Sequence, residues 1–388
     1  MNTNAAPSTL TLQNARVVLP DRIMEAGTVV VESGRIVSVG ESATPKGEVS
    51  DLSGATLLPG FIDVHIHGAV GVDVMEATPS ALHQVSEYLA TQGVTGWLPT
   101  LVPGSDENYA SVAAAVSEAM RSSEGNGARI LGLHYEGPFV NSAQCGALHV
   151  EYFKTYSSPS DLDSLPVNEQ MARMITLAPE VAGGVELIRE LTRRGWVVSI
   201  GHTRASLELL DQALAAGARH MTHFMNAMSP LHHRNPGPIA WGLSHDDVTF
   251  DMIADGIHLD PLMLKLLVKL KGVQGITLIS DAIAAAGKGD GDYAIWGETI
   301  SVKNGRTANA SGSIAGSVIT MLDAVRVMHS LGLSYIDIAH MASTNPARLL
   351  HLDGECGSIE PGKRADLVAL DGNGAVRLTL TSGEVVVG

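Results

Sequence analysis

Eight short apolar segments alternate with helix-like patterns through the middle of the chain, and this alternation constrains the fold more than any other feature. The segments are FIDVHIH (61–67), VTGWLPT (94–100), RILGLHY (129–135), MITLA (174–178), WVVSIGH (196–202), HMTHF (220–224), VTFDMIA (248–254) and ITLIS (276–280). Most gaps between them carry apolar residues at helical spacing. In SLELLDQALAAG, Ser206 suits an N-cap and Gly217 can end the helix, while Leu207, Leu210 and Leu214 share one face. We therefore predict an α/β fold, a (β/α)8 TIM-like barrel, with a doubly wound parallel sheet as the alternative.

Both ends of the chain have the alternating pattern of short β-strands. The first sixty residues contain LTLQNARVVL, GTVVVESGRIVSVGES and ATLLPG, and the last forty contain GSIEPGKRADLVALD and VRLTLTSGEVVVG. Because this pattern flanks a different middle, we expect the termini to pair into one small β-sandwich domain. The predicted organisation is residues 1–60 and 351–388 in the β domain, with residues 61–350 in the barrel.

The composition excludes several classes of protein. The chain has 25 Lys+Arg against 41 Asp+Glu and a formal net charge of -16, which disfavours nucleic acid as a partner because phosphate contacts need a basic surface. No apolar run reaches the length of a membrane span, and the N-terminus lacks the pattern of a secretory signal. The two cysteines, Cys145 and Cys356, cannot form a disulfide framework. We therefore expect a cytoplasmic protein that has neither nucleic acid nor a membrane as partner.

Five of the eight apolar segments end in a residue type that can bind a metal. The first carries His65 and His67, whose alternation points both imidazoles to the same side of a strand. The others are Glu136 after the third segment, His202 at the end of the fifth, His223 in the sixth and Asp281 after the eighth. In a closed parallel barrel these ends converge on one rim. A single histidine there would signify little, but four histidines and two carboxylates together suit Zn²⁺ or Fe²⁺ and are enough for one or two ions.

Longer motifs run through nearly the whole chain. They are PGFIDVHIHG (59–68), LHYEGPF (133–139), GHT (201–203), THFMNAM (222–228), HHRNPG (232–237), DGIHLDP (255–261), SDA (280–282), GSIAGS (312–317), NPARLL (345–350) and GSIEPGKRADLVALD (357–371). In these motifs the sequence resembles the amidohydrolase superfamily. Its EGPF, HFMNAM and HHRNPG segments are similar to the branch of N-acetylglucosamine-6-phosphate deacetylases.

The resemblance implies a division of the metal ligands. Glu136, His202 and His223 would hold the primary ion, and His65 and His67 could hold a second ion with Glu136 bridging the two. Cyclic-amide hydrolases of the same superfamily bridge their metals with a carboxylated lysine at the end of strand four. Here the fourth segment, MITLAPE, offers no lysine.

The chemistry of amide hydrolysis suggests roles for two further residues. Asp281 can take a proton from a metal-activated water and hand it to the departing amine, although a helix cap or a supporting carboxylate is the alternative. His149 is the candidate for holding the carbonyl oxygen as negative charge develops. Family members usually show Lys-Gly-Ala-His in this loop, whereas residues 144–149 read QCGALH here, so the placement of His149 is open. Cys145 fits an inert loop cysteine better than a ligand or a nucleophile, because no partner base is identifiable.

The resemblance also implies contacts to a phosphorylated sugar. Arg234 and His258 match phosphate-contacting positions, and an arginine fork suits phosphate oxygens. In the family the arginine reaches in from the neighbouring subunit, which implies a homodimer. Asn226 and Ala227 match further substrate contacts.

The implied reaction is metal-dependent hydrolysis of N-acetyl-D-glucosamine 6-phosphate to D-glucosamine 6-phosphate and acetate. Three alternatives stay open at this point. The substrate could be N-acetylgalactosamine 6-phosphate, or another N-acyl compound, which the altered 144–149 loop makes plausible. From a different class, the chain could be a non-catalytic amidohydrolase-like scaffold that has lost its metals, although all six candidate ligands are present.

Overall fold

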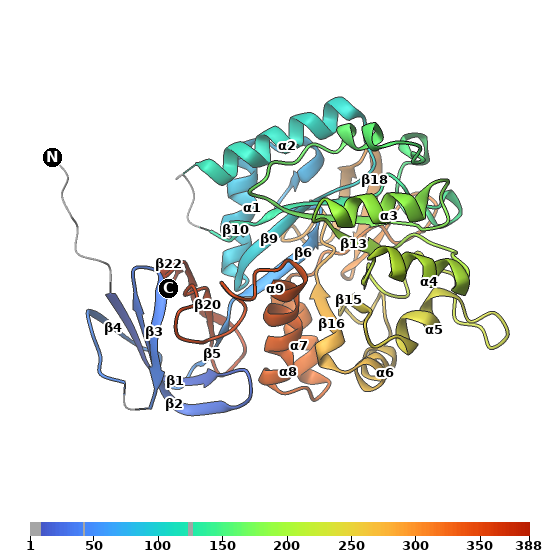
Figure 1. The fold of residues 1–388 in the computed structure, drawn as a ribbon. Coiled ribbons are helices and arrows are strands. Elements are labelled where there is room, and N and C mark those ends of the chain that lie inside the picture. The colour runs from blue at the N-terminus through green and yellow to red at the C-terminus, as the bar shows by residue number, and fades with distance from the viewer. Residues whose placement is uncertain (1–8, 42, 123–126) are drawn as a thin grey trace.

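The structure is a computed structural model that describes residues 9–41, 43–122 and 127–388. Part of the expectation of no secretory signal concerns residues 1–8, and these lie outside the described residues. Figure 1 shows a strand-and-helix barrel beside a smaller β region, in which strands from both ends of the chain lie together. Among the described residues, no helix is both long and apolar enough to cross a membrane.

The barrel is built from the predicted strands, all parallel. They are β6 (Phe61–Ile66), β9 (Val94–Leu101), the interrupted pair β10 (Arg129–Ile130) and β11 (Gly132–Glu136), β12 (Ala172–Leu177), β13 (Val197–Ile200), β14 (His220–Met221), β15 (Thr249–Ile253) and β16 (Ile276–Ile279). β10 and β11 both pair with β9, each strand from β11 to β16 pairs with the next in chain order, and β6 pairs with β9. This order confirms the barrel prediction, because a doubly wound sheet would reverse its strand order part-way.

The first and last strands meet at a seam that closes the barrel. The Asp281 N–H, just beyond β16, donates to the His65 carbonyl of β6 at 2.9 Å. One step earlier, the Ser280 hydroxyl donates to the Asp63 carboxylate at 2.6 Å. The seam therefore includes a buried side-chain contact, and it lies directly beneath residues of the predicted metal site.

Helices cover the outside of the barrel. They are α1 (Pro79–Thr91), α2 (Asp106–Arg121), α3 (Gly184–Arg193), α4 (Leu207–Ala216), α5 (Gly237–Ser244), α6 (Pro261–Lys271), α7 (Met321–Ser330), α8 (Tyr335–Ala339) and α9 (Asn345–Leu349), with the π-helix η6 (His340–Thr344) between the last two. The predicted caps of α4 are correct, since the Ser206 side chain accepts from the Leu209 N–H and Gly217 ends the helix at φ 118°. Leu210 of the predicted apolar face is buried, whereas Leu207 at the first turn is exposed.

Strands from both termini form one eight-stranded sheet. Its members are β1 (Thr9–Val18), β2 (Ile23–Glu32), β3 (Arg35–Gly40), β4 (Glu48–Asp51), β5 (Thr56–Pro59), β20 (Leu367–Leu370), β21 (Val376–Thr381) and β22 (Glu384–Val387). β5 joins the two halves, because it pairs with β1 on one side and with β20 on the other. The sheet has a buried cluster of its own, which includes Leu12, Val29, Leu57 and Leu367. The expected pairing of the termini is thus present, while the exact division at residues 60 and 351 stays a prediction.

A three-stranded insertion follows the last barrel strand. It consists of β17 (Gly291–Ile295), β18 (Glu298–Lys303) and β19 (Arg306–Ala308), and a short ribbon of β7 (Gly68–Ala69) and β8 (Val72–Asp73) follows the first barrel strand. The insertion packs on a small apolar cluster that includes Ile283, Ile300 and Ala315. Its β17–β18 turn carries Trp296 to the barrel rim, where the indole meets the His67 ring edge-on with 5.2 Å between centroids.

Candidate metal centre and active site

Three of the predicted ligands form a tight triad at the carboxyl ends of their strands. Glu136 ends β11, His202 follows β13 and His223 follows β14. Glu136 Oε1 lies 2.9 Å from His202 Nε2 and 3.0 Å from His223 Nε2. The two imidazole nitrogens are 3.1 Å apart. A tetrahedral zinc ion with bonds of about 2.0–2.1 Å would space its ligand atoms roughly 3.3 Å apart, so this triad is close to the size a metal requires.

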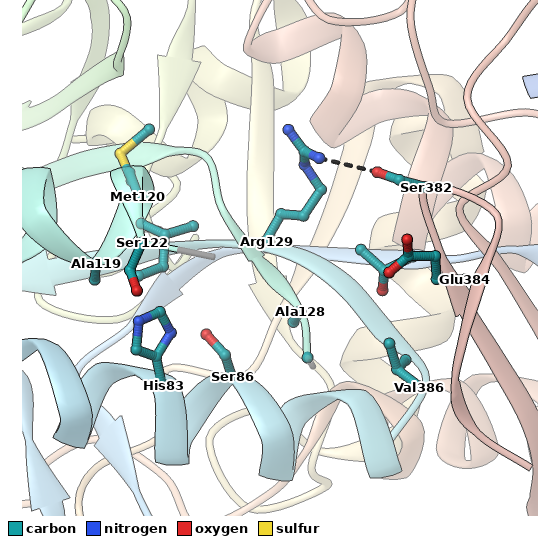
Figure 2. A pocket seen from close by; sticks show the side chains of 13 residues that line it. His83, Ser86, Ala119, Met120, Ser122, Ala128, Arg129, Ser382, Glu384 and Val386 are labelled. Atoms are coloured by element: carbon teal, nitrogen blue, oxygen red, sulfur yellow. Dashed lines mark hydrogen bonds between the residues drawn. The ribbon is translucent and has the colours of Figure 1, made fainter. Parts of the chain in front are cut away.

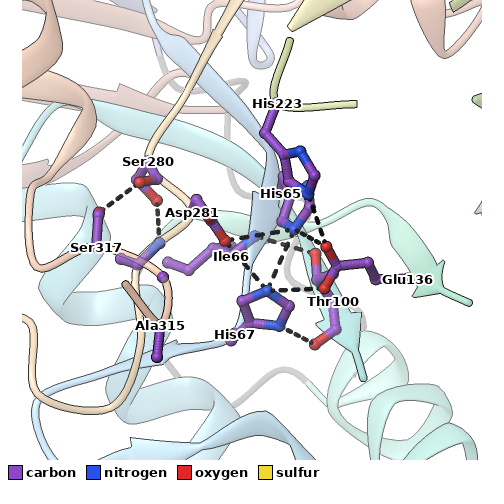
Figure 3. A network of polar contacts seen from close by, with 12 residues as sticks. His65, Ile66, His67, Thr100, Glu136, His223, Ser280, Asp281, Ala315 and Ser317 are labelled. Atoms are coloured by element: carbon purple, nitrogen blue, oxygen red, sulfur yellow. Dashed lines mark hydrogen bonds and ion pairs between the residues drawn. The ribbon is translucent and has the colours of Figure 1, made fainter. Parts of the chain in front are cut away.

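The other three ligands form a second triad beside the first (Figure 3). His65 Nε2 and His67 Nε2 are 3.2 Å apart, and Asp281 Oδ1 lies 3.4 Å from the former and 3.2 Å from the latter. Glu136 stands between the triads, because its Oε2 lies 3.4 Å from His67 Nε2 while its Oε1 faces the first triad. Within each triad the ligand atoms lie within 4.8 Å of one another, and all six residues are buried.

The hydrogen bonds behind the imidazoles indicate that these triads suit a cation. His202 Nδ1 donates to the Gln144 carbonyl at 2.7 Å, and His67 Nδ1 donates to the Thr100 carbonyl at 3.1 Å. In a neutral imidazole the proton is then on Nδ1, so Nε2 presents a bare lone pair. Both Nε2 atoms face Glu136 oxygens, and two facing lone pairs repel, so a positive charge is needed between them, either a metal ion or a proton on Nε2. A backbone carbonyl on the remote nitrogen is also the usual way that proteins orient a metal-binding histidine.

The electrostatics of the site agree with this reading. Burial lowers the pKa of His223, but the Glu136 carboxylate outweighs it and raises that pKa to about 9. Burial would raise the pKa of Glu136, yet the surrounding histidines, His65 first among them, hold it well below its usual value. Burial also lowers the pKa of His65 well below its ordinary range. The centre therefore keeps an ionised carboxylate among buried imidazoles and attracts positive charge.

Three of the six candidate metal ligands have a left-handed backbone. The φ angles are 47° at His202, 31° at His223 and 50° at Asp281. Non-glycine residues seldom adopt this conformation, and it persists at functional sites only where surrounding contacts impose it. At His223 the imposing contact is the buried Asp251 carboxylate of β15, which accepts a short hydrogen bond from the His223 N–H. These turns let the side chains bend inward over the barrel mouth.

A cavity of about 530 Å³ opens above the centre. Five of the six candidate ligands line it, together with a polar set and an apolar set. The polar set includes Asn226, Ala227 and His258, and the apolar set includes Ala147, Leu148, Trp296 and Ile314. His258 is held from behind, since its Nδ1 bonds the Asp255 carboxylate at 2.6 Å. A buried ligand cluster at the floor of an open cavity can activate water against a bound small molecule.

Comparison with known proteins agrees with this geometry. The amidohydrolase family model matches residues 56–386. The chain belongs to the amidohydrolase family. It is 38% identical to the N-acetylglucosamine-6-phosphate deacetylase of Bacillus subtilis (strain 168), with 97% of this chain and 96% of that relative covered. The N-acetylgalactosamine-6-phosphate deacetylase of Escherichia coli O157:H7 is also 38% identical, with 83% of this chain and 85% of that relative covered.

Solved structures lead to the same family. The N-acetylglucosamine-6-phosphate deacetylase of Pasteurella multocida superposes with a TM-score of 0.90 at 29% identity, covering 97% of this chain and 99% of that one. A mutant of the Mycobacterium smegmatis enzyme in complex with N-acetyl-D-glucosamine-6-phosphate superposes with a TM-score of 0.88 at 31% identity. This match covers 99% of this chain and 100% of that one. The prediction of an enzyme of the N-acetylglucosamine-6-phosphate deacetylase type is thereby confirmed, and the scaffold alternative is set aside.

Three predicted site residues of this amidohydrolase are not part of the cavity lining: His65, which is buried beside His67 in the second triad, His149 and Arg234. His149 Nε2 donates to the Trp296 carbonyl at 2.8 Å, and it is the preceding Leu148 that lines the cavity. Arg234 lies on an exposed loop, where its Nη1 is 2.9 Å from His233 Nε2 of the same chain. The altered 144–149 loop nevertheless reaches the metal centre through its backbone, because the Gln144 carbonyl orients His202.

Sequence reasoning missed several residues that shape the site. Asp63 and Asp251 are fully buried carboxylates that hold backbone amides of site residues. Asp63 stands two positions before His65 on the same strand face, and that spacing is a signal that could have been used. Nothing comparable marks Trp296, whose place on the rim depends on how the 291–308 insertion folds back.

Other cavities of the described chain lie apart from the centre, among them the following two. One, of about 430 Å³, lies between α1, the region around β10 and the C-terminal hairpin, where Arg129 donates to the Ser382 hydroxyl at 2.9 Å (Figure 2). The other, of about 580 Å³, lies at the amino ends of β13 to β16 and is lined by Arg219, His220 and Arg348 among others. Neither includes a predicted site residue, so the proposed chemistry belongs to the cavity above the triads.

Proposed function

We propose that this enzyme hydrolyses the acetamide of N-acetyl-D-glucosamine 6-phosphate to D-glucosamine 6-phosphate and acetate. The single observation that carries the proposal is the buried set of four imidazoles and two carboxylates at the floor of the rim cavity. The relatives support the proposal, because N-acetylglucosamine-6-phosphate deacetylases are 32–38% identical to this chain over nearly its whole length.

Glu136, His202 and His223 would hold one divalent ion, Zn²⁺ or Fe²⁺. His65 and His67 could hold a second, with Glu136 between the two, because its Oε2 faces His67 while its Oε1 faces His202 and lies 3.7 Å from His65 Nε2. An ion bound there would lower the pKa of a water toward neutrality and polarise the amide carbonyl. One or two ions per subunit are both compatible with these ligands.

Asp281 is the proposed proton-transfer group. Its carboxylate is nearly buried and lines the cavity, with Oδ1 beside His65 and His67. From there it can accept a proton from the attacking water and later deliver it to the leaving nitrogen. Without that proton the amine would have to leave as its anion, which is a poor leaving group. His149 would serve the carbonyl oxygen only if its Nε2 exchanged the Trp296 carbonyl for the substrate.

The sugar phosphate would occupy the polar side of the cavity. Asn226 and Ala227 would contact the sugar, and His258 would face the phosphate with the nitrogen that Asp255 leaves free. Arg234, exposed and without an acidic partner among the described residues, would reach the cavity of a neighbouring subunit. We therefore propose a homodimer with shared phosphate sites. We also propose a cytoplasmic location, because both cysteines are free thiols, as a reducing compartment favours.

The galactosamine epimer is a second candidate substrate, because a relative of that name is as similar as the glucosamine-type relatives. The test is acetate release from both N-acetylhexosamine 6-phosphates and from unphosphorylated N-acetylglucosamine, using protein of measured metal content. Strong preference for the glucosamine phosphate supports the proposal, and preference for the galactosamine phosphate transfers it to the epimer. Failure on all three with metal bound would point to a different N-acyl substrate.

A further inference from the structure

The turn that carries Asp281 lies at the seam of the barrel, and its backbone is fastened on both sides. The Asp281 N–H donates to the His65 carbonyl at 2.9 Å, and the Asp281 carbonyl accepts from the Ser317 N–H at 2.7 Å. With φ at +50°, this residue occupies the left-handed region, which is uncommon for non-glycine residues, although aspartate adopts it more readily than most. The direction of its carboxylate therefore depends on those two hydrogen bonds.

Ser317 attaches to the turn at three points. Its hydroxyl donates to the Ser280 carbonyl at 2.5 Å. Its N–H donates to Asp281, as above, and its carbonyl accepts from the Ile283 N–H at 3.0 Å. Ser317 is 2% exposed and is not part of the cavity lining, so it has no route to the substrate. Whatever it contributes to catalysis must pass through the turn.

Asp63 fastens the same turn from the opposite strand. Its Oδ2 accepts from the Ser280 hydroxyl at 2.6 Å, and its Oδ1 accepts from the N–H groups of Ser280 and His65, each at 3.3 Å. Asp63 is fully buried. A buried carboxylate is unfavourable unless it is well hydrogen-bonded. The hydrogen bonds of Asp63 connect β6, which carries His65, to the turn that carries Asp281.

The segment that carries Ser317 also fits closely against Asp281. Gly316 has φ at +57°, and a Cβ atom there would lie 2.9 Å from the Asp281 carbonyl oxygen. Its carbonyl is anchored in turn by the Thr307 hydroxyl of β19 at 2.6 Å. The glycine thus allows a close backbone approach that a side chain would prevent, and this approach brings Ser317 into register with the turn.

We propose that Ser317, with Asp63 and Ser280, is a positioning residue that holds the Asp281 carboxylate between the His65–His67 pair and the cavity. Figure 3 shows Ser317 and Ser280 beside Asp281. This inference rests on the proton-transfer role proposed for Asp281. The competing explanation is that Ser317 only stabilises the fold. The two differ in kinetics, because a misplaced proton-transfer group lowers kcat whereas a simple loss of stability lowers the amount of active enzyme.

The test compares Ser317→Ala with a matched control, Ser343→Ala, in the metal-loaded enzyme. Ser343 is also fully buried, and its hydroxyl also donates to a backbone carbonyl, that of Pro59 at 3.1 Å, away from the cavity. We expect Ser317→Ala to lower kcat per folded, metal-loaded chain by about 10- to 100-fold with KM changed less than about twofold. The control should keep kcat within about twofold of the wild type.

A double mutant isolates the route of the effect. In an Asp281→Asn background, Ser317→Ala should cost less than about twofold in kcat, because its only route to the chemistry is already lost. Equal losses in both backgrounds, or a kcat for Ser317→Ala equal to that of the control, would overturn the proposal. If Ser317→Ala does not fold, Ser317→Cys keeps the volume with a weaker donor and is expected to lose kcat in the same direction.

Failure of the proposed function would be recognisable separately. It would appear as a wild-type enzyme without amidase activity, or as an Asp281→Asn variant that retains full activity. The positioning claim would then be decided by a crystal structure of Ser317→Ala. An Asp281 φ that leaves the left-handed region supports the claim, and an unchanged φ and carboxylate direction refutes it.

Discussion

Replacing Asp281 by Asn is expected to separate the proton-transfer role proposed for it from metal binding. The side chain keeps its shape, and the hydrogen bonds that fasten the turn, to the His65 carbonyl and from the Ser317 N–H, are made by the backbone. We therefore expect a change in unfolding free energy below about 1 kcal/mol. Loss of a general acid–base typically costs about 10²–10⁴ in rate. This corresponds to roughly 3–5 kcal/mol in activation free energy, so catalysis should suffer far more than folding.

The assay is steady-state acetate release with metal content determined on the same samples. The Glu136–His202–His223 triad does not include Asp281, so the primary ion should remain bound. Asp366→Asn is the matched control, because this carboxylate is also buried but bonds Arg364 and the Ser382 N–H in the terminal β region. An Asp281→Asn enzyme with wild-type kcat, or one that loses its metal as completely as its activity, would refute the proton-transfer role.

Three further predictions follow from the site. Arg234→Ala should raise KM for phosphorylated substrate by roughly 10-fold or more with kcat little changed, and an unchanged KM would remove the phosphate contact. Mixing Arg234→Ala with Asp281→Asn chains should restore part of the activity if subunits share sites, and verified subunit exchange without recovery would exclude this arrangement. In the native protein, Cys145 should react with a thiol reagent while Cys356 reacts only after unfolding. Burial raises the pKa of Cys356 to about 11, so roughly one thiol in a thousand is ionised at pH 8; equal reaction rates would contradict that environment.

The barrel, and the convergence of the candidate ligands on its rim, were predictable because both are encoded locally. Strand segments such as FIDVHIH show their period over a few residues, and the parallel topology brings their carboxyl ends to one rim. Once the topology is assumed, His65, Glu136 and His223 must converge. That these three residues come together could be predicted without knowing how the loops fold.

The parts that escaped prediction depend on long-range packing. Ser317 lies 36 positions after Asp281, and only the folded 291–308 insertion returns the chain to the seam. The loop containing Leu148 and His149 is similar: its sequence does not say which of the two faces the cavity, and the bond from His149 to the Trp296 carbonyl decides it. Asp63 was accessible to strand-period reasoning, but a carboxylate in an apolar strand has no evident partner until β16 is placed beside it.

The most direct test of the central claim is metal content measured together with acetate release for the wild type and for His202→Ala. The claim is that the strand-end ligands hold the ion that hydrolysis requires. It predicts at least one tightly bound divalent ion per wild-type chain. The folded His202→Ala variant and the chelator-treated wild type should each lose metal and activity together. Adding Zn²⁺ or Fe²⁺ should restore activity to the chelator-treated wild type. A wild-type enzyme that stays fully active without metal, or a His202→Ala variant with wild-type metal content and activity, would contradict it.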